Sequence, residues 1–118
     1  MNGNRFRQLA LALPEAVEGA HRGHPDFRVS RKVFATLNAD ESAGHVKCDP
    51  VNLELLVRAN PVVFRDAWGG RWLGIDLSQV DEGEVLELLE DAWLSVTRKA
   101  LAASYERRGS ERWQRRDL

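Results

Sequence analysis

The side chains in this sequence that are best suited to chemistry are cations interspersed with aromatic residues. They fall in segments with a strand-like pattern and in the turns between them: Arg28, Arg31, Lys32, Lys47, Arg65, Arg71 and Trp72. Guanidinium and ammonium groups neutralise phosphates, and an aromatic ring can stack on a nucleobase. The same residues also suit an ordinary solvated sheet face with charged turns. The pattern therefore indicates a candidate surface for nucleic acid or another anion, with a merely solvated face as the alternative.

The histidines and the cysteine do not form a metal-binding or nucleophilic pattern. His21 and His24 are three residues apart in a predicted loop, whereas a zinc-binding histidine pair needs helical i, i+4 spacing. Cys48 is the only cysteine, which excludes an internal disulfide and a cysteine zinc cluster. Its inward strand phase predicts a buried thiol with a raised pKa. No serine lies in a nucleophile elbow. The sequence predicts no enzymatic activity, no metal and no cofactor.

Length and composition are typical of one small domain. The chain has 118 residues, of which 43% are hydrophobic, and its formal net charge of −1 excludes the strongly basic body of a DNA-packaging protein. No apolar run approaches the roughly 20 residues that a membrane span needs. The N-terminal residues lack the pattern of a secretory signal. We therefore expect a cytoplasmic protein with no membrane partner.

Charge is unevenly distributed along the chain. Residues 1–97 contain 10 basic and 15 acidic side chains, whereas residues 98–118 contain 7 basic and 3 acidic ones. Arg112, Arg115 and Arg116 surround Trp113 in this basic C-terminal extension, which we expect to span residues 105–118 and to continue the last helix. Such a tail can bind DNA, a protein partner, or the acidic face of a second copy of the chain.

Hydrophobic periodicity and capping residues predict eight elements in the domain of residues 1–104. Pro14 ends the first helix, Asp49-Pro50 opens the second, and Asp81 with Glu84 caps the last. The predicted helices cover residues 4–13, 50–60 and 82–100, and the predicted strands cover 27–30, 33–37, 45–48, 62–65 and 72–77. Residues 15–25 read as a polar connection. The order αβββαββα predicts an α+β domain in which helices cover an antiparallel sheet.

Strand alternation divides these residues between the two faces of the predicted sheet. The helix-covered face is expected to hold Val29, Val33, Ala35, Val46, Cys48, Leu73, Ile75 and Leu77. The uncovered face is expected to hold Arg28, Phe34, Thr36, His45, Lys47, Trp72 and Asp76. The predicted recognition surface therefore depends on one geometric condition: Arg28, Lys47 and Trp72 must share the uncovered face.

Several segments in order resemble one known family. They are Leu13-Pro14-Glu15-Ala16-Val17-Glu18, Gly23-His24-Pro25-Asp26-Phe27-Arg28-Val29, Lys32-Val33-Phe34-Ala35-Thr36-Leu37, Val46-Lys47-Cys48-Asp49-Pro50, Asn60-Pro61 and Arg71-Trp72-Leu73. In this order and spacing the set resembles the MmcQ/YjbR family over about residues 6–102. The resemblance implies a compact α+β fold related to the frataxin-like architecture. It also implies a double-wing arrangement that has been proposed to bind DNA.

The sequence as a whole thus predicts a non-enzymatic protein that binds nucleic acid weakly. The binding surface would comprise the first hairpin, the exposed sheet face and the basic tail. The alternative is a module that binds a protein or a small anion and has no nucleic-acid activity.

Overall fold

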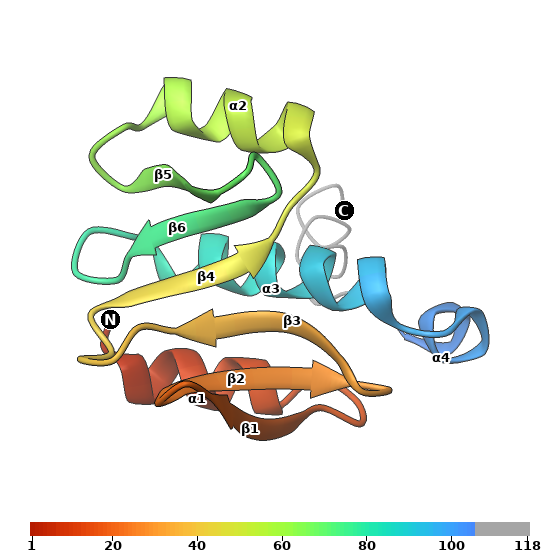
Figure 1. The fold of residues 1–118 in the computed structure, drawn as a ribbon. Coiled ribbons are helices and arrows are strands. Elements are labelled where there is room, and N and C mark those ends of the chain that lie inside the picture. The colour runs from red at the N-terminus through yellow and green to blue at the C-terminus, as the bar shows by residue number, and fades with distance from the viewer. Residues whose placement is uncertain (106–118) are drawn as a thin grey trace, which may run out of the picture.

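One antiparallel sheet of six strands carries helices α1 and α3 on the same face (Figure 1). The computed structural model describes residues 1–105 of the chain. The strands are β1 (Val17–His21), β2 (His24–Val29), β3 (Lys32–Leu37), β4 (Ala43–Lys47), β5 (Phe64–Trp68) and β6 (Trp72–Asp76), in the spatial order β1-β2-β3-β4-β6-β5. The helices are α1 (Gly3–Leu11), α2 (Pro50–Ala59), α3 (Glu82–Val96) and α4 (Lys99–Ser104). The predicted single α+β domain is confirmed.

Three helices begin at side chains that cap their free backbone N–H groups. At the start of α1, the side chain of Asn2 accepts a hydrogen bond from Arg5 N. At the start of α2, the side chain of Asp49 accepts from Asn52 N, and Pro50 occupies the first helical position. Asp81 accepts from Glu84 N at the start of α3. These caps satisfy donors that a helix leaves unpaired, which is why Asp49 and Asp81 located the starts of α2 and α3 correctly in the sequence, whereas the cap at Asn2 was not predicted.

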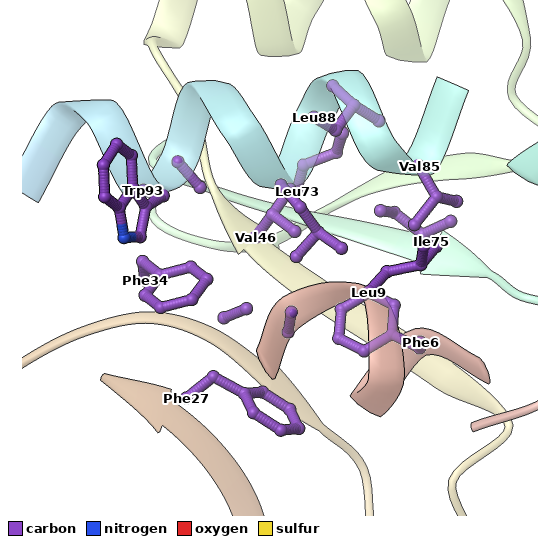
Figure 2. Packing of buried hydrophobic residues seen from close by; sticks show 14 of the residues in the cluster. Phe6, Leu9, Phe27, Phe34, Val46, Leu73, Ile75, Val85, Leu88 and Trp93 are labelled. Atoms are coloured by element: carbon purple, nitrogen blue, oxygen red, sulfur yellow. The ribbon is translucent and has the colours of Figure 1, made fainter. Parts of the chain in front are cut away.

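The hydrophobic core lies between the sheet and the two helices α1 and α3. Phe6 and Leu9 of α1 meet Phe27 of β2, and Trp93 of α3 lies over the other end of this layer (Figure 2). Gly44 lets α1 approach β4 closely, since a Cβ at this position would lie 2.6 Å from the Phe6 ring. In the described part of the chain, no helix is both long enough and apolar enough to cross a membrane.

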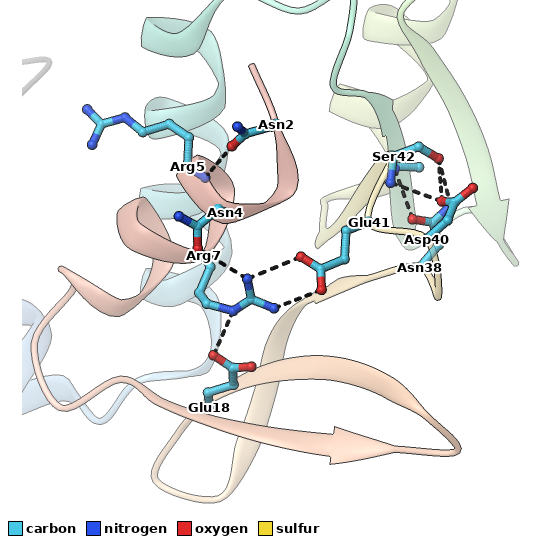
Figure 3. Close-up of polar contacts among 10 residues, drawn as sticks. Asn2, Asn4, Arg5, Arg7, Glu18, Asn38, Asp40, Glu41 and Ser42 are labelled. Atoms are coloured by element: carbon cyan, nitrogen blue, oxygen red, sulfur yellow. Dashed lines mark hydrogen bonds and ion pairs between the residues drawn. The ribbon is translucent and has the colours of Figure 1, made fainter.

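Strand β1 was not predicted, because residues 15–25 read as a polar connection. Most of its side chains are exposed, so it shows no hydrophobic alternation, and backbone pairing with β2 defines it. Arg7 of α1 also holds β1 in place (Figure 3). Its Nε donates to Glu18 of β1 at 2.9 Å, and its two terminal nitrogens donate to the two carboxylate oxygens of Glu41, between β3 and β4, each at 3.1 Å. An edge strand fixed by its backbone and by one arginine leaves little trace in the sequence pattern.

The predicted placement of Phe34 on the uncovered face is wrong. Phe27 pairs with Ala35 and the next residue, Arg28, pairs with Val33, so β3 contains one extra residue between these pairs. Such a bulge reverses the alternation on one side of it. Phe34 is fully buried in the core below Trp93 (Figure 2). Val33 shares the face of Arg28 and is only half-buried, although the alternation placed it on the helix-covered face.

The last predicted helix is interrupted. Helix α3 ends at Val96, and Thr97 and Arg98 are extended before the short α4. Tyr105 then folds back, with its hydroxyl donating to the buried Glu90 at 2.8 Å and its ring centroid 5.0 Å from that of Trp93. Continuation of the helix beyond this point concerns residues 106–118, which lie outside the described residues, as do Arg112, Arg115 and Arg116. The domain boundary after residue 104 stays a prediction.

Candidate ligand-binding face of the sheet

A row of directly paired residues crosses all six strands on the face opposite α1 and α3. Residues paired across neighbouring strands share a face. From β1 to β5 this central row consists of Gly19, Asp26, Thr36, His45, Gly74 and Arg65. Four residues with polar side chains, Asp26, Thr36, His45 and Arg65, thus lie in one row, although 39 positions separate Asp26 from Arg65 in the chain.

Asp26 is a buried carboxylate that is held by its neighbour on the same strand. Arg28 Nε donates to Asp26 Oδ1, and Arg28 Nη2 donates to Oδ2, each at 2.8 Å. These hydrogen bonds raise the pKa of the Arg28 guanidinium further above its usual value. Gly19 gives the pair room, because a Cβ there would lie 2.9 Å from Asp26 Oδ1. Arg28 therefore lies on the predicted face, but its charge is already matched by a buried partner.

His45 is the buried polar side chain at the centre of the row. It is 5% exposed, its Nδ1 lies 3.1 Å from Thr36 Oγ1, and its ring centroid is 4.5 Å from that of Trp68. Burial lowers the pKa of its imidazole to about 4, and the positive charges of Arg65 and His24 act in the same direction. The ring is consequently neutral at neutral pH and can both donate and accept a hydrogen bond.

Two tryptophans cover the neighbouring part of this face. Trp72 pairs with Lys47 across β4 and β6, and its ring meets that of Trp68 edge to face, with centroids 5.9 Å apart. Trp68 is 53% exposed, whereas Trp72 is half-buried. The register confirms that Arg28, Lys47 and Trp72 share the face opposite the helices.

Trp68 was placed in a turn by the sequence and was not recognised as a site residue. It lies at the end of β5, where Asp66 pairs with Leu73 and Trp68 pairs with Trp72, so Ala67 is an extra residue. Without this bulge Trp68 would point to the opposite face. The strand was also predicted two to three residues too early, at 62–65 instead of Phe64–Trp68.

Four exposed cations gather at one end of the sheet. Lys32 is the first residue of β3, and Lys47 is the last residue of β4, which runs antiparallel to β3. Arg71 directly precedes β6, which runs antiparallel to β4 on its other side. The three side chains therefore belong to the same end of the sheet. Arg31 joins them from the β2–β3 turn. We call this group, Arg31, Lys32, Lys47 and Arg71, the cationic end. Within residues 1–105 none of the four has an ion pair.

Arg65 is separated from the cationic end and contributes to a hollow. Its stem lies on Gly74, where a Cβ would come 2.8 Å from Arg65 Cγ. The hollow has a volume of about 400 Å³, and its lining includes Thr36 and His45 at the centre. Arg65 and Trp68 of β5 line one side, and residues of the β1–β2 turn line the other.

Cys48 lies outside the hollow that Arg65 and Trp68 line, just after the end of β4. Its thiol is half-buried instead of buried, and burial, followed by the charges of Asp49 and Asp91, raises its pKa to about 11, in the expected direction. The described residues contain no group of three or more side chains that could hold a metal ion.

Comparisons with known proteins identify relatives in family and in fold. A family model described as YjbR matches residues 11–95. The crystal structure of the Deinococcus radiodurans protein DR2400, which carries a DUF419 domain, superposes with a TM-score of 0.70 at 22% identity, over 84% of this chain and 80% of that one. A protein from Pseudomonas syringae superposes with a TM-score of 0.61 at 18% identity, over 78% and 96% of the two chains. No curated protein matches the chain.

Proposed function

The chain belongs to the YjbR family, and from this premise we propose that it is a non-enzymatic protein that binds nucleic acid weakly. The phosphate backbone would contact the cationic end, and a base would stack on Trp68. One observation carries the proposal: four cations without an ion pair in residues 1–105 gather at one end of the sheet, where Lys47 shares the face that α1 and α3 leave open with the exposed Trp68.

The arrangement favours weak and salt-sensitive binding. Four neutralised phosphates give a slope of log affinity against log salt of about −3.6 for duplex DNA and about −2.8 for single strands. The folded body as a whole opposes binding, because residues 1–97, the cationic end included, carry a net charge of −5. Stacking on Trp68 favours single strands, whose bases are accessible.

Fluorescence anisotropy with labelled single-stranded and duplex oligonucleotides tests this proposal in the full-length chain. Replacing two cations in Lys47→Ala/Arg71→Ala should reduce the magnitude of the salt slope by about two. The matched control, Arg5→Ala/Arg58→Ala, removes the same charge from α1 and α2, away from the cationic end, and should leave the slope nearly unchanged. Trp68→Ala should weaken binding to single strands more than binding to duplex.

Two results would overturn the proposed surface. Absence of any complex at about 25 mM salt, where phosphate contacts are strongest, would exclude nucleic-acid binding. Equal weakening by the two double variants would show that only net charge matters. The tail is tested separately with Arg112→Ala/Arg115→Ala/Arg116→Ala; if this variant alone abolishes binding, the cationic end is not the binding surface.

A further inference from the structure

The hollow on the open face has the size and composition of a small-molecule site. Its volume of about 400 Å³ falls within the range of roughly 300–1,000 Å³ that is usual for such sites. Polar groups converge on it from strands far apart in the sequence: His24 from β2, Thr36 from β3, His45 from β4 and Arg65 from β5. None of the residues of the cationic end lines it.

The charge of the hollow suits an anion. Arg22 and Arg65 line it, and neither has an ion pair within residues 1–105. Asp26 is the only carboxylate in the lining, and both of its oxygens already accept hydrogen bonds from Arg28. A carboxylate or phosphate in the hollow could therefore bind two guanidinium groups that have no ion pair, without competition from a carboxylate of the protein. Guanidinium groups bind carboxylates and phosphates through paired hydrogen bonds.

The aromatic wall of the hollow suits a flat ring. Trp68 is the largest exposed aromatic side chain on this face, and it already stacks at an angle of 44° against His45. The neutral imidazole of His45 and the hydroxyl of Thr36 supply uncharged polar contacts at the centre. A ring lying on Trp68 could thus reach these two groups while its anionic substituent points to Arg65.

The β1–β2 turn holds its arginine in a costly conformation. Arg22 has a φ of 52° and precedes Gly23 with a φ of 80°, so a residue with a long side chain occupies a left-handed position that favours glycine or asparagine. A two-residue hairpin turn of type I′ requires positive φ at both central residues, and the β2–β3 turn has the same feature at Ser30 and Arg31. Here the turn places Arg22 in the wall opposite Arg65.

We propose that this hollow binds a small planar anion, that is, an aromatic ring bearing a carboxylate or a phosphate. Trp68 stacks on the ring, Arg65 and Arg22 bind the anionic group, and Thr36 with His45 contacts the polar edge of the ring. This site shares Trp68 with the nucleic-acid surface proposed above, but Arg22 and Arg65 line the hollow and no residue of the cationic end does. Weakened binding in Arg65→Gln therefore tests the hollow, whereas weakened binding in Lys47→Ala/Arg71→Ala tests the nucleic-acid surface, and either proposal can fail without the other.

Isothermal titration calorimetry with two ring-bearing anions, adenosine 5′-monophosphate and indole-3-acetate, tests the proposal. Their neutral counterparts are adenosine and indole, and inorganic phosphate and acetate supply the anion without a ring. At least one ring-bearing anion should saturate the protein at concentrations up to about 5 mM and should bind at least about tenfold more tightly than its neutral counterpart or the ring-free anion. The phosphate and carboxylate arms distinguish which anionic group the site accepts.

Variants and a spectroscopic readout locate the binding. Arg65→Gln should weaken the anion about tenfold and leave the neutral counterpart unchanged, and Trp68→Leu should weaken both. Arg58→Gln, which removes the same charge from α2, outside both the hollow and the cationic end, should change affinity by less than about twofold. In the unmodified protein, the indole N–H resonance of Trp68 should shift during the titration.

Three outcomes would overturn the site. One is the absence of saturable binding by either ring-bearing anion. Another is equal binding of the charged and neutral members of each pair. The third is saturable binding that leaves the Trp68 resonance unmoved or that is weakened equally by Arg65→Gln and Arg58→Gln.

Discussion

Acidification is expected to destabilise the folded protein through His45. The imidazole is 5% exposed, and its pKa falls from 6.5 to about 4, first because burial disfavours the charged ring and then because Arg65 and His24 repel it. In the unfolded chain the ring regains its ordinary pKa of about 6.5. Folding therefore favours the neutral ring over the protonated one.

The sign of the effect follows from proton binding by the two states. Above pH 6.5 the ring is neutral in both, and its contribution to stability is complete. Between pH 6.5 and 4 the unfolded chain binds a proton that the folded protein excludes, so the free energy of unfolding falls with pH. With 1.36 kcal/mol per pH unit, the loss is about 2 kcal/mol at pH 5 and approaches about 3 kcal/mol below pH 4.

Urea unfolding followed by tryptophan fluorescence at pH 7 and pH 5 measures this loss. His45→Gln keeps an amide near Thr36 but cannot take up the proton, so its stability should fall by about 2 kcal/mol less than that of the unmodified protein over this interval. His21→Gln, an exposed position at the end of β1, is the matched control and should retain the full pH dependence. Identical pH dependence in His45→Gln and the unmodified protein would refute the reasoning.

Three further predictions concern the packing that supports this face. Arg7→Ala should lower the free energy of unfolding in urea by about 1–2 kcal/mol and speed hydrogen exchange in β1, because a half-buried guanidinium loses two carboxylate partners. Arg5→Ala, which loses one exposed carboxylate partner, should have a clearly smaller effect. Gly44→Ala should lower the free energy of unfolding by about 1–3 kcal/mol, because its methyl group would clash with the Phe6 ring in the core. Gly74→Ala should lower it less, because its methyl group would meet the flexible side chain of Arg65; equal losses of stability would contradict this distinction. Cys48 should react with a disulfide reagent at pH 8 about tenfold more slowly in the folded protein than in urea, because its pKa is raised to about 11 and the greater nucleophilicity of the thiolate offsets part of its lower abundance; equal rates would show an accessible, ordinary thiol.

The starts of α2 and α3 and most of the strand phase could be predicted because local chemistry determines them. Asp49-Pro50 and Asp81 satisfy backbone donors at helix starts, and they do so without any long-range contact. Alternation placed Val46 and Leu73 in the core and Lys47 on the open face correctly, since one face of the sheet is covered and the other is not.

Strand β1 and the charge state of the site could not be predicted, because both depend on partners distant in the chain or on backbone pairing. The exposed side chains of β1 carry no periodicity, and Glu18 becomes structural only when α1 brings Arg7 to it. Arg28 likewise counts as a free cation in the sequence. Only the paired strands reveal that the neighbouring Asp26 is buried and accepts both of its hydrogen bonds.

The identity of the exposed aromatic residue depends on two bulges. Strict alternation puts Phe34 on the open face, but one extra residue in β3 turns it into the core. In β5 the extra residue Ala67 has the opposite effect and brings Trp68 to the open face beside His45. Neither bulge contains glycine, so no residue type marks them in the sequence. Because each bulge moves one large ring between the faces, the stacking surface consists of Trp68 with the half-buried Trp72, and it lies next to Arg65 instead of the ion-paired Arg28. The most informative test of a ligand on this face is therefore a substitution of Trp68 or Arg65, the two residues whose positions the register decides.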